Sequence, residues 1–168
     1  MTGQIRRLIL DRRGFTLTEL MVVLGISMII SMAGYSGFTG FQKKEYLRSA
    51  ASRLSGNMRE ARMLAMEQGV SHTVVFTGST YTVFVDTNED FIPDADERII
   101  HQVDVADHDP SITLRMVGDL PMRFDARGIP KCATGGIRTA AIVFQNDQAF
   151  YRMVMISALG RIKIEPTE

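Results

Sequence analysis

An acidic segment near the middle of the chain has the residue types and the spacing of a divalent-cation site. It reads Asp86-Thr-Asn-Glu-Asp-Phe-Ile-Pro-Asp-Ala-Asp-Glu97. Counted from Asp86, oxygen ligands fall at the first, third, fifth, seventh, ninth and twelfth positions, which is the ligand spacing of an EF-hand loop. They are Asp86, Asn88, Asp90, the backbone carbonyl of Ile92, Asp94 and Glu97. Because calcium takes about six to eight hard oxygen ligands, the spacing predicts a calcium site.

Two features of this segment depart from the EF-hand pattern. The sixth position, where a glycine is expected, holds Phe91, and a side chain there disfavours the left-handed turn. The flanking residues predict strands, whereas an EF-hand loop joins two helices. Without a metal, the crowded acidic groups would also repel one another. An acidic, solvated hairpin loop is therefore the alternative interpretation.

A second segment with chemical meaning is Gly14-Phe15-Thr-Leu-Thr-Glu19, which stands at the head of an apolar run. The 23 residues from Leu20 to Gln42 include no Asp, Glu, Lys, Arg or His, and a membrane-spanning helix needs about 20 apolar residues. A carboxylate in such a helix is costly unless it has a partner. Cleavage after Gly14 would supply one, because Phe15 would then carry an α-amino group within reach of Glu19 on the same or a neighbouring chain.

Charges before the apolar run predict its orientation in a membrane. Four arginines outweigh Asp11 there, and such a basic excess keeps the N-terminal flank on the cytoplasmic side; they are Arg6, Arg7, Arg12 and Arg13. The rest of the chain would then face outward. An alternative is a secretory signal peptide cut near Met32-Ala33-Gly34, which would release a secreted calcium-binding protein.

The remaining pattern predicts an α+β fold. Apolar residues recur at helical spacing through residues 43–67, so the helix continues as an amphipathic one that ends at Gly69. Gly34, Gly37 and Gly40 lie between its two halves, where they would allow either bending or close helix packing. Short strands are predicted beyond it, at 72–77, 81–85, 98–103, 112–116, 122–124, 140–144, 150–156 and 161–164. A long N-terminal helix packed on antiparallel sheet is the expected architecture.

Other reactive side chains do not form a recognisable catalytic motif, and the chain is not expected to be an enzyme. His72, His101 and His108 are scattered without zinc spacing, so His101 and His108 are expected to be surface or strand residues. Cys132 is the only cysteine and cannot form a disulfide within the chain. A buried thiol is the favoured interpretation, and a bridge between subunits is the alternative.

The residues Gly14-Phe15-Thr-Leu-Thr-Glu19-Leu20 resemble, position by position, the class III signal of type IV pilins and type II secretion pseudopilins. The resemblance implies that a prepilin peptidase cuts between Gly14 and Phe15 and methylates Phe15. It also implies that Glu19 neutralises the N-terminus of an adjacent subunit in a filament. Loss of the 14-residue leader, which carries four Arg and one Asp, would change the formal charge from 0 to −3.

The head of the chain resembles the GspH/FimT family of minor pilins and pseudopilins. The resemblance rests on Phe124-Asp-Ala-Arg-Gly128-Ile-Pro130, on Ile156-Ser-Ala-Leu-Gly160-Arg161-Ile-Lys-Ile164 and on the acidic loop. It implies a subunit that primes or caps a type IV pilus or a type II secretion pseudopilus, with other pilin subunits as partners. The expected domains are a leader at 1–14, a transmembrane helix at 15–42 in the bacterial inner membrane, and a periplasmic head at 43–168.

A DNA-binding role is the alternative that this resemblance implies. Some FimT-type minor pilins take up DNA through a C-terminal Gly-Arg-x-Arg motif, and this chain has Gly160-Arg161-Ile-Lys163. Lys163 keeps a positive charge for phosphate but lacks the bidentate fork of arginine. Arg152, Arg161 and Lys163 are predicted to form a small basic strip if DNA is bound. The competing interpretation is an edge strand that ends in solvated charges.

Overall fold

The computed structural model describes residues 14–107, 109–118, 120–135 and 139–166, apart from the side chains of residues 33–37 and 166. The described residues divide into two compact units, with the division between Gly40 and Phe41. Residues 1–13 of the predicted leader and His108 lie outside the described residues.

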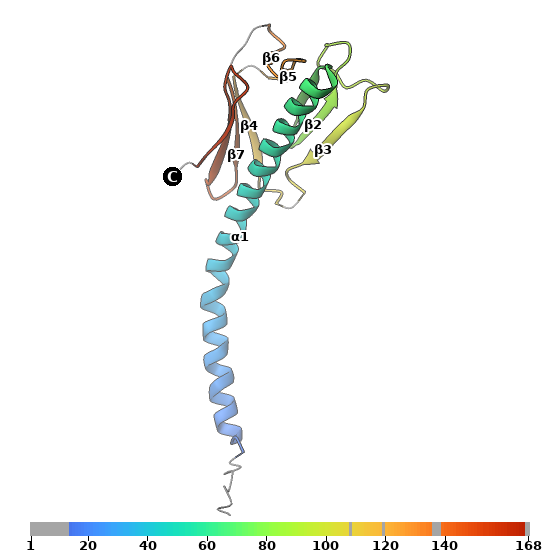
Figure 1. Cartoon of the computed structure of the whole chain (residues 1–168). Coiled ribbons are helices and arrows are strands. Elements are labelled where there is room, and N and C mark those ends of the chain that lie inside the picture. The colour runs from blue at the N-terminus through green and yellow to red at the C-terminus, as the bar shows by residue number, and fades with distance from the viewer. Residues whose placement is uncertain (1–13, 108, 119, 136–138, 167–168) are drawn as a thin grey trace, which may run out of the picture. The chain divides into compact units, whose positions relative to one another are not determined.

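One long helix, α1, runs from Leu17 to Gln68 (Figure 1). It ends where the sequence predicts, because Gly69 takes the left-handed conformation with φ of 68° and its amide still donates to the carbonyl of Ala65 at 3.0 Å. Within the described residues, no helix has both the length and the apolarity required to cross a membrane. The predicted transmembrane segment, 15–42, includes residues 33–37, whose side chains are not described.

Two antiparallel sheets follow the helix in the sequence. The first has the strand order β3-β2-β1-β5-β6 and the second the order β4-β7-β8-β9. The strands are β1 His72–Thr77, β2 Thr80–Val85, β3 Ile99–Asp104, β4 Thr113–Gly118, β5 Met122–Phe124, β6 Pro130–Cys132, β7 Ala140–Gln145, β8 Tyr151–Ile156 and β9 Ile162–Pro166. The predicted α+β class, with a helix on antiparallel sheet, is confirmed.

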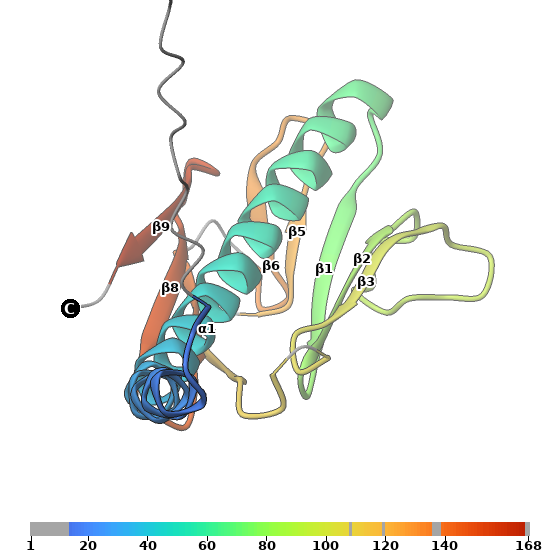
Figure 2. The same cartoon turned by 90° about the horizontal axis from the view of Figure 1, so that it is seen from below.

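The core of the second unit lies between the helix and both sheets. One face of α1 supplies residues three and four positions apart, and all of them are buried: Leu47, Ala51, Leu54, Met58, Ala61 and Ala65. They join a single cluster with Val74 and Tyr81 of the first sheet and with Phe144 and Val154 of the second. Figures 1 and 2 show this part of the helix laid against strands of both sheets. The helix therefore holds two separate sheets in one core.

Strand β6 was missing from the sequence prediction. It has only three residues and begins with Pro130, and proline is depleted in strands. It forms because β5 offers a partner, with Met122 opposite Cys132 and Phe124 opposite Pro130. Cys132 is buried there, as predicted, and its burial disfavours a bridge to another subunit.

Candidate functional site

The N-terminus of α1 is closed by a reciprocal set of hydrogen bonds. The hydroxyl of Thr16 accepts from the amide of Glu19 at 3.2 Å. In return, Glu19 Oε2 accepts from the amide of Thr16 at 3.2 Å and from its hydroxyl at 3.2 Å. This is a capping box, in which a Thr and a Glu three residues apart satisfy each other's amide groups. The sequence interpretation assigned Glu19 to assembly alone and missed this second role, although the Thr-x-x-Glu spacing signals it.

The predicted cleavage site lies directly before this cap. The Phe15 side chain is 82% exposed. A Cβ added at Gly14 would meet no atom within 4 Å. No contact among the described residues therefore requires a glycine at position 14, so a requirement for it would have to come from outside the folded chain.

Beyond the cap, the first turns of α1 present apolar side chains that the described structure leaves exposed. They are Leu20, Met21, Val22, Val23, Leu24, Ile26, Met28, Ile29, Ile30 and Met32. Soluble monomers rarely expose apolar surface as continuous as this, and such a surface marks contact with a membrane or another protein.

The acidic loop between β2 and β3 is held at both ends by carboxylates that accept hydrogen bonds from backbone amides. Asp86 Oδ2 accepts from the amide of Phe91 at 3.3 Å and from the hydroxyl of Thr73 at 2.6 Å. Glu97 accepts from the amide of Thr87 at 2.8 Å and from the amide of Asp94 at 3.3 Å. The loop is therefore a defined structure, with its first and twelfth residues directed inward.

Phe91 takes the conformation that the sequence analysis expected only of glycine. Its φ is 67°, in the left-handed region. The ring lies over the guanidinium of Arg123, with 4.7 Å between the ring centroid and Cζ, and its amide is bonded to Asp86. These contacts offset the cost of the conformation. The left-handed turn that a side chain at position 91 was expected to disfavour is therefore formed.

Between its ends, the loop gathers three predicted ligand positions on its exposed side. Asn88 Nδ2 donates to Asp90 Oδ2 at 3.1 Å and to Asp94 Oδ2 at 3.0 Å. Asp90 Oδ1 accepts from the amide of Ile92 at 2.7 Å. In the part of the chain that the structure describes, no three His, Cys, Asp or Glu side chains are grouped so that they could hold a metal ion. The calcium site remains a prediction.

Arg123 is a buried residue that sequence reasoning missed. Its side chain, on β5, is 9% exposed; it donates to the carbonyl of Glu89 at 2.6 Å and lies 3.1 Å from Glu89 Oε2. Ser71 also donates to the Glu89 carboxylate, at 2.9 Å. A buried cation requires such partners, and here they fix the acidic loop to the first sheet. Only the pairing of β5 with β1 brings Arg123 to the loop, so no local signal could have found it.

The two sequence motifs of the head converge on one arginine of α1. Arg62 donates from Nε to the carbonyl of Gly128 at 2.9 Å, from Nη1 to that of Gly160 at 3.0 Å and from Nη2 to that of Leu159 at 3.4 Å. Both glycines are left-handed, with φ of 71° and 74°. A Cβ on Gly160 would lie 2.8 Å from the Gly128 carbonyl oxygen. The sequence analysis assigned no role to Arg62.

Asp125 shapes the first of these turns. Its Oδ1 accepts from the amides of Arg127 and Ile129, each at 2.9 Å. Burial raises the pKa of this carboxyl, but the hydrogen bonds from Ile129 and Arg127 and the ammonium of Lys131 outweigh burial and hold the pKa below its ordinary value. Asp125 is therefore ionised when it holds the turn.

The sequence of the head decides its family. Residues 50–160 match the family described as type II transport protein GspH. The chain belongs to the GspH family. Residues 10–35 match a second family description, the prokaryotic N-terminal methylation motif. A search of curated protein sequences gives no significant match.

Two solved structures resemble this GspH-family chain. The crystal structure of the type IV minor pilin FimU of Pseudomonas aeruginosa aligns with a TM-score of 0.56 at 18% identity, over 75% of this chain and 92% of FimU. The structure of the minor pseudopilin EpsH of the Vibrio cholerae type 2 secretion system aligns with a TM-score of 0.55 at 8% identity, over 71% and 96%. These likenesses establish the shared fold, and the predicted resemblance to minor pilins and pseudopilins is confirmed.

The GspH-family head does not form the basic strip that was predicted at its C-terminal end. On β8 and β9, Arg152 pairs with Pro166 while Lys163 pairs with Met155. Since side chains alternate along a strand, Arg152 and Lys163 lie on opposite faces of the sheet. Lys163 is also 3.5 Å from Glu165 Oε1, whereas Arg161 is exposed. The prediction that Arg152, Arg161 and Lys163 form one basic strip is therefore wrong. DNA binding by Arg161 and Lys163 remains an untested prediction.

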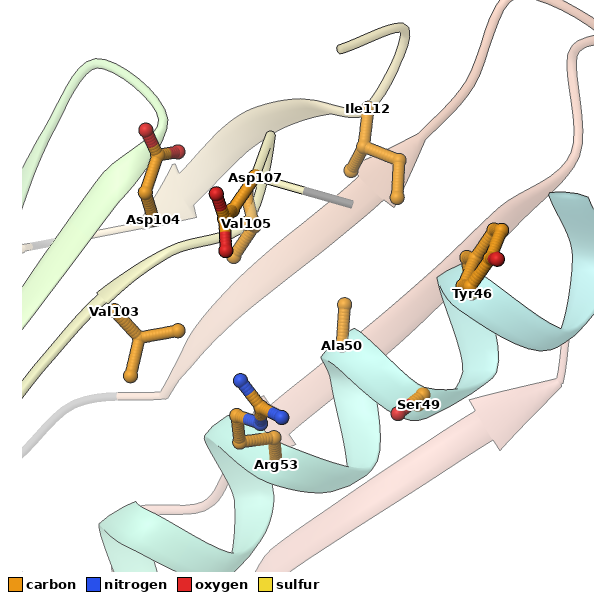
Figure 3. Close-up of a pocket in the computed structure, with 9 residues that line it drawn as sticks. All are labelled: Tyr46, Ser49, Ala50, Arg53, Val103, Asp104, Val105, Asp107 and Ile112. Atoms are coloured by element: carbon orange, nitrogen blue, oxygen red, sulfur yellow. The ribbon is translucent and has the colours of Figure 1, made fainter. Parts of the chain in front are cut away.

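A small cavity lies between α1 and the connection from β3 to β4 (Figure 3). Tyr46, Ala50 and Arg53 line it from the helix, and Val105 and Ile112 line it from the connection. Its volume of about 40 Å³ accommodates a few water molecules. It is too small for a substrate.

His72 and His101, the two histidines that the structure describes, have structural contacts. His72 is buried and its Nδ1 lies 2.9 Å from the carbonyl of Val70; burial lowers its pKa, and the nearby charge of Arg98 adds to this effect, although the bond to Val70 opposes it. His101, on β3, is paired with Glu60 of α1 at 2.9 Å.

Proposed function

We propose that this chain is a minor pilin or pseudopilin that is cut after Gly14 by a prepilin peptidase and joins a type IV pilus or a type II secretion pseudopilus. In this proposal the helix anchors the precursor in the inner membrane and later enters the filament. The head lies in the periplasm and primes or caps the assembly. The chain has no enzymatic role in it.

The observation that carries the proposal is the co-occurrence of an N-terminal methylation motif at residues 10–35 with a GspH-family head at residues 50–160. The exposed cleavage site supports it, since Phe15 is 82% exposed and a Cβ added at Gly14 would meet no atom of the described residues within 4 Å. The exposed apolar helix surface supports it too, because lipid first and neighbouring helices afterwards would cover that surface.

Glu19 has two successive roles in this proposal. In the uncut chain its carboxylate caps the helix by binding Thr16. Cleavage places a new ammonium group on Phe15, the residue before Thr16. The carboxylate then has a cationic partner at its own N-terminus or at that of the adjacent subunit, and in the apolar filament core such a pair is strongly favoured over an isolated charge.

The experiment follows processing and assembly separately in cells that contain the prepilin peptidase and the filament system. Mass analysis of the native chain is expected to find N-methyl-Phe15, and Gly14→Val is expected to prevent cleavage without changing the fold. Glu19→Gln is the decisive variant, because glutamine keeps the capping hydrogen bonds and removes only the charge. It is expected to be cleaved but to lose crosslinking to neighbouring subunits, while the matched Glu45→Gln variant assembles normally.

Two results would contradict the proposal. A mature chain that begins near Gly34 or beyond would indicate a secreted protein. Normal assembly of Glu19→Gln would show that Glu19 serves only as a helix cap. A deletion strain scored in parallel for protein secretion, pilus display and transformation then decides which filament the subunit serves.

DNA uptake is the second function that the head resemblance implies, and exposed Arg161 is the residue that favours it. Its test is DNA retardation by the full chain in detergent micelles at physiological salt, with Arg161→Ala as the variant. Absence of retardation by the unsubstituted chain would exclude this role.

A further inference from the structure

We propose that the loop from Asp86 to Glu97 binds one calcium ion. The ligands are the side chains of Asp86, Asn88, Asp90, Asp94 and Glu97 together with the carbonyl of Ile92. This site is independent of the proposed role in filament assembly, so either proposal can fail without the other.

The observation that points to a ligand is an oxygen atom of Asp86. The side chain is fully buried, with 0% exposure. Its Oδ2 reaches across the loop to the amide of Phe91. Among the described residues, its Oδ1 has no hydrogen-bond partner. A buried carboxylate oxygen without a donor is costly, and a cation at the first ligand position would satisfy it.

The backbone of the loop already makes the turn that calcium ligation requires. The sixth residue, Phe91, is left-handed, and its amide donates to the first, Asp86. This turn directs the carbonyl of the seventh residue, Ile92, and the side chains before it toward one centre in loops with this ligand spacing. The ion would therefore require little rearrangement of the backbone.

The side-chain amide of Asn88 lies between two of the predicted ligands, Asp90 and Asp94. Asn88 Nδ2 bridges Asp90 Oδ2 and Asp94 Oδ2 at 3.1 and 3.0 Å. An amide hydrogen is only partly positive, so a divalent ion that replaced it would compensate the two carboxylates better. The Asn88 side chain would then turn its oxygen to the ion. The Glu97 carboxylate would give up its hydrogen bond from the amide of Asp94 or of Thr87 and coordinate the ion instead.

The loop is held in place by residues that are not ligands. Glu89, at the fourth position, binds Arg123 and Ser71. Arg123 therefore neutralises a carboxylate outside the ligand set and leaves the ligands available. Calcium suits this loop better than magnesium, because calcium accepts more than six oxygens in irregular geometry whereas magnesium requires a near-octahedral shell.

The test titrates the full chain, purified in detergent micelles and stripped with a chelator, with calcium chloride in a calorimeter. One calcium per chain is expected, with a Kd of about 10⁻⁵ to 10⁻³ M, and magnesium chloride at the same concentration is expected to give no saturable heat. The melting temperature is expected to rise by about 3–6 °C at ten times the Kd.

Two exposed residues of the same loop provide a matched pair of variants. Asp94→Asn removes a ligand charge and is expected to weaken calcium binding at least about tenfold. Asp96→Asn removes the same charge at the eleventh position, which is not a ligand, and is expected to change the Kd less than about threefold. Absence of calcium heat in the unsubstituted chain would overturn the proposal. Equal weakening by the two variants would also overturn it, because it would indicate general attraction to an acidic surface.

Discussion

The two ends of helix α1 are built from similar apolar residues but lie in opposite environments. Leu24 is 61% exposed and Leu54 is 0% exposed. Within four residues of Leu54 the sequence mixes alanines with polar residues, whereas within four residues of Leu24 the only polar side chain is that of Ser27. The comparison teaches that the apolar character of a residue does not by itself reveal what covers it. The C-terminal part of α1 is buried within the chain, whereas the described residues leave the apolar side chains of the N-terminal part exposed.

The largest expected difference between the two regions comes from a pair of identical substitutions. Leu54→Ala removes a fully buried side chain and is expected to lower the free energy of unfolding of the head by about 2–5 kcal/mol. Leu24→Ala is expected to leave it unchanged within about 0.5 kcal/mol. Denaturant unfolding of the full chain in detergent measures both. Equal losses would show that the exposed region contributes to the stability of the head.

Substitutions of a bonded and an exposed arginine of α1 should also differ in their effect on stability. Arg62→Lys removes hydrogen bonds to the carbonyls of Gly128, Gly160 and Leu159 and is expected to cost about 2 kcal/mol, since lysine cannot reproduce the planar fork. Arg48→Lys, at an exposed position beside Glu45, is the control and is expected to have almost no effect. Similar effects of the two variants in chemical unfolding would refute the role assigned to Arg62.

A smaller effect is expected at the N-terminal cap. Thr16→Ala removes the hydroxyl that accepts from the amide of Glu19 and is expected to destabilise the first helical turn by about 1 kcal/mol. Amide hydrogen exchange should increase over residues 17–20 and remain unchanged in the head strands. Glu19→Gln keeps the capping geometry and should preserve protection in this turn. Increased exchange throughout the head would contradict the division into two independent regions.

The smallest effect concerns pH and distinguishes buried from exposed histidine. Burial lowers the pKa of His72 below its unfolded value. The unfolded chain therefore takes up a proton on His72 at a higher pH than the folded chain does. The free energy of unfolding is thus expected to fall as the pH decreases through and below about 6.5. His72→Gln should reduce this dependence of the unfolding free energy on pH. His101→Gln, at a half-exposed position, serves as the comparison. An unchanged slope in the His72 variant would refute the assignment.

The fold could be predicted largely because its signals are local. The helical spacing from Leu47 to Ala65, the Gly69 that ends the helix and the β-branched and aromatic runs of β1 and β2 are properties of adjacent residues. Strand β6 could not be predicted, since a three-residue strand that begins with proline is stable only through its pairing with β5. The acidic loop was located from the spacing of its residues. Its left-handed turn at Phe91, where the pattern expects glycine, could not be predicted, because a distant residue, Arg123, supports that conformation.

The sequence by itself determined the N-terminal signal, the long helix, the position of the acidic loop and the α+β class. Each of these depends on residues that are close together in the chain, so composition and spacing are sufficient. Only the tertiary structure decided that Arg62 joins the Gly128 and Gly160 turns, that Arg123 fixes the acidic loop, and that Arg152 and Lys163 face opposite ways. These contacts depend on strand register and on how the helix packs on the sheets, which distant parts of the chain establish together.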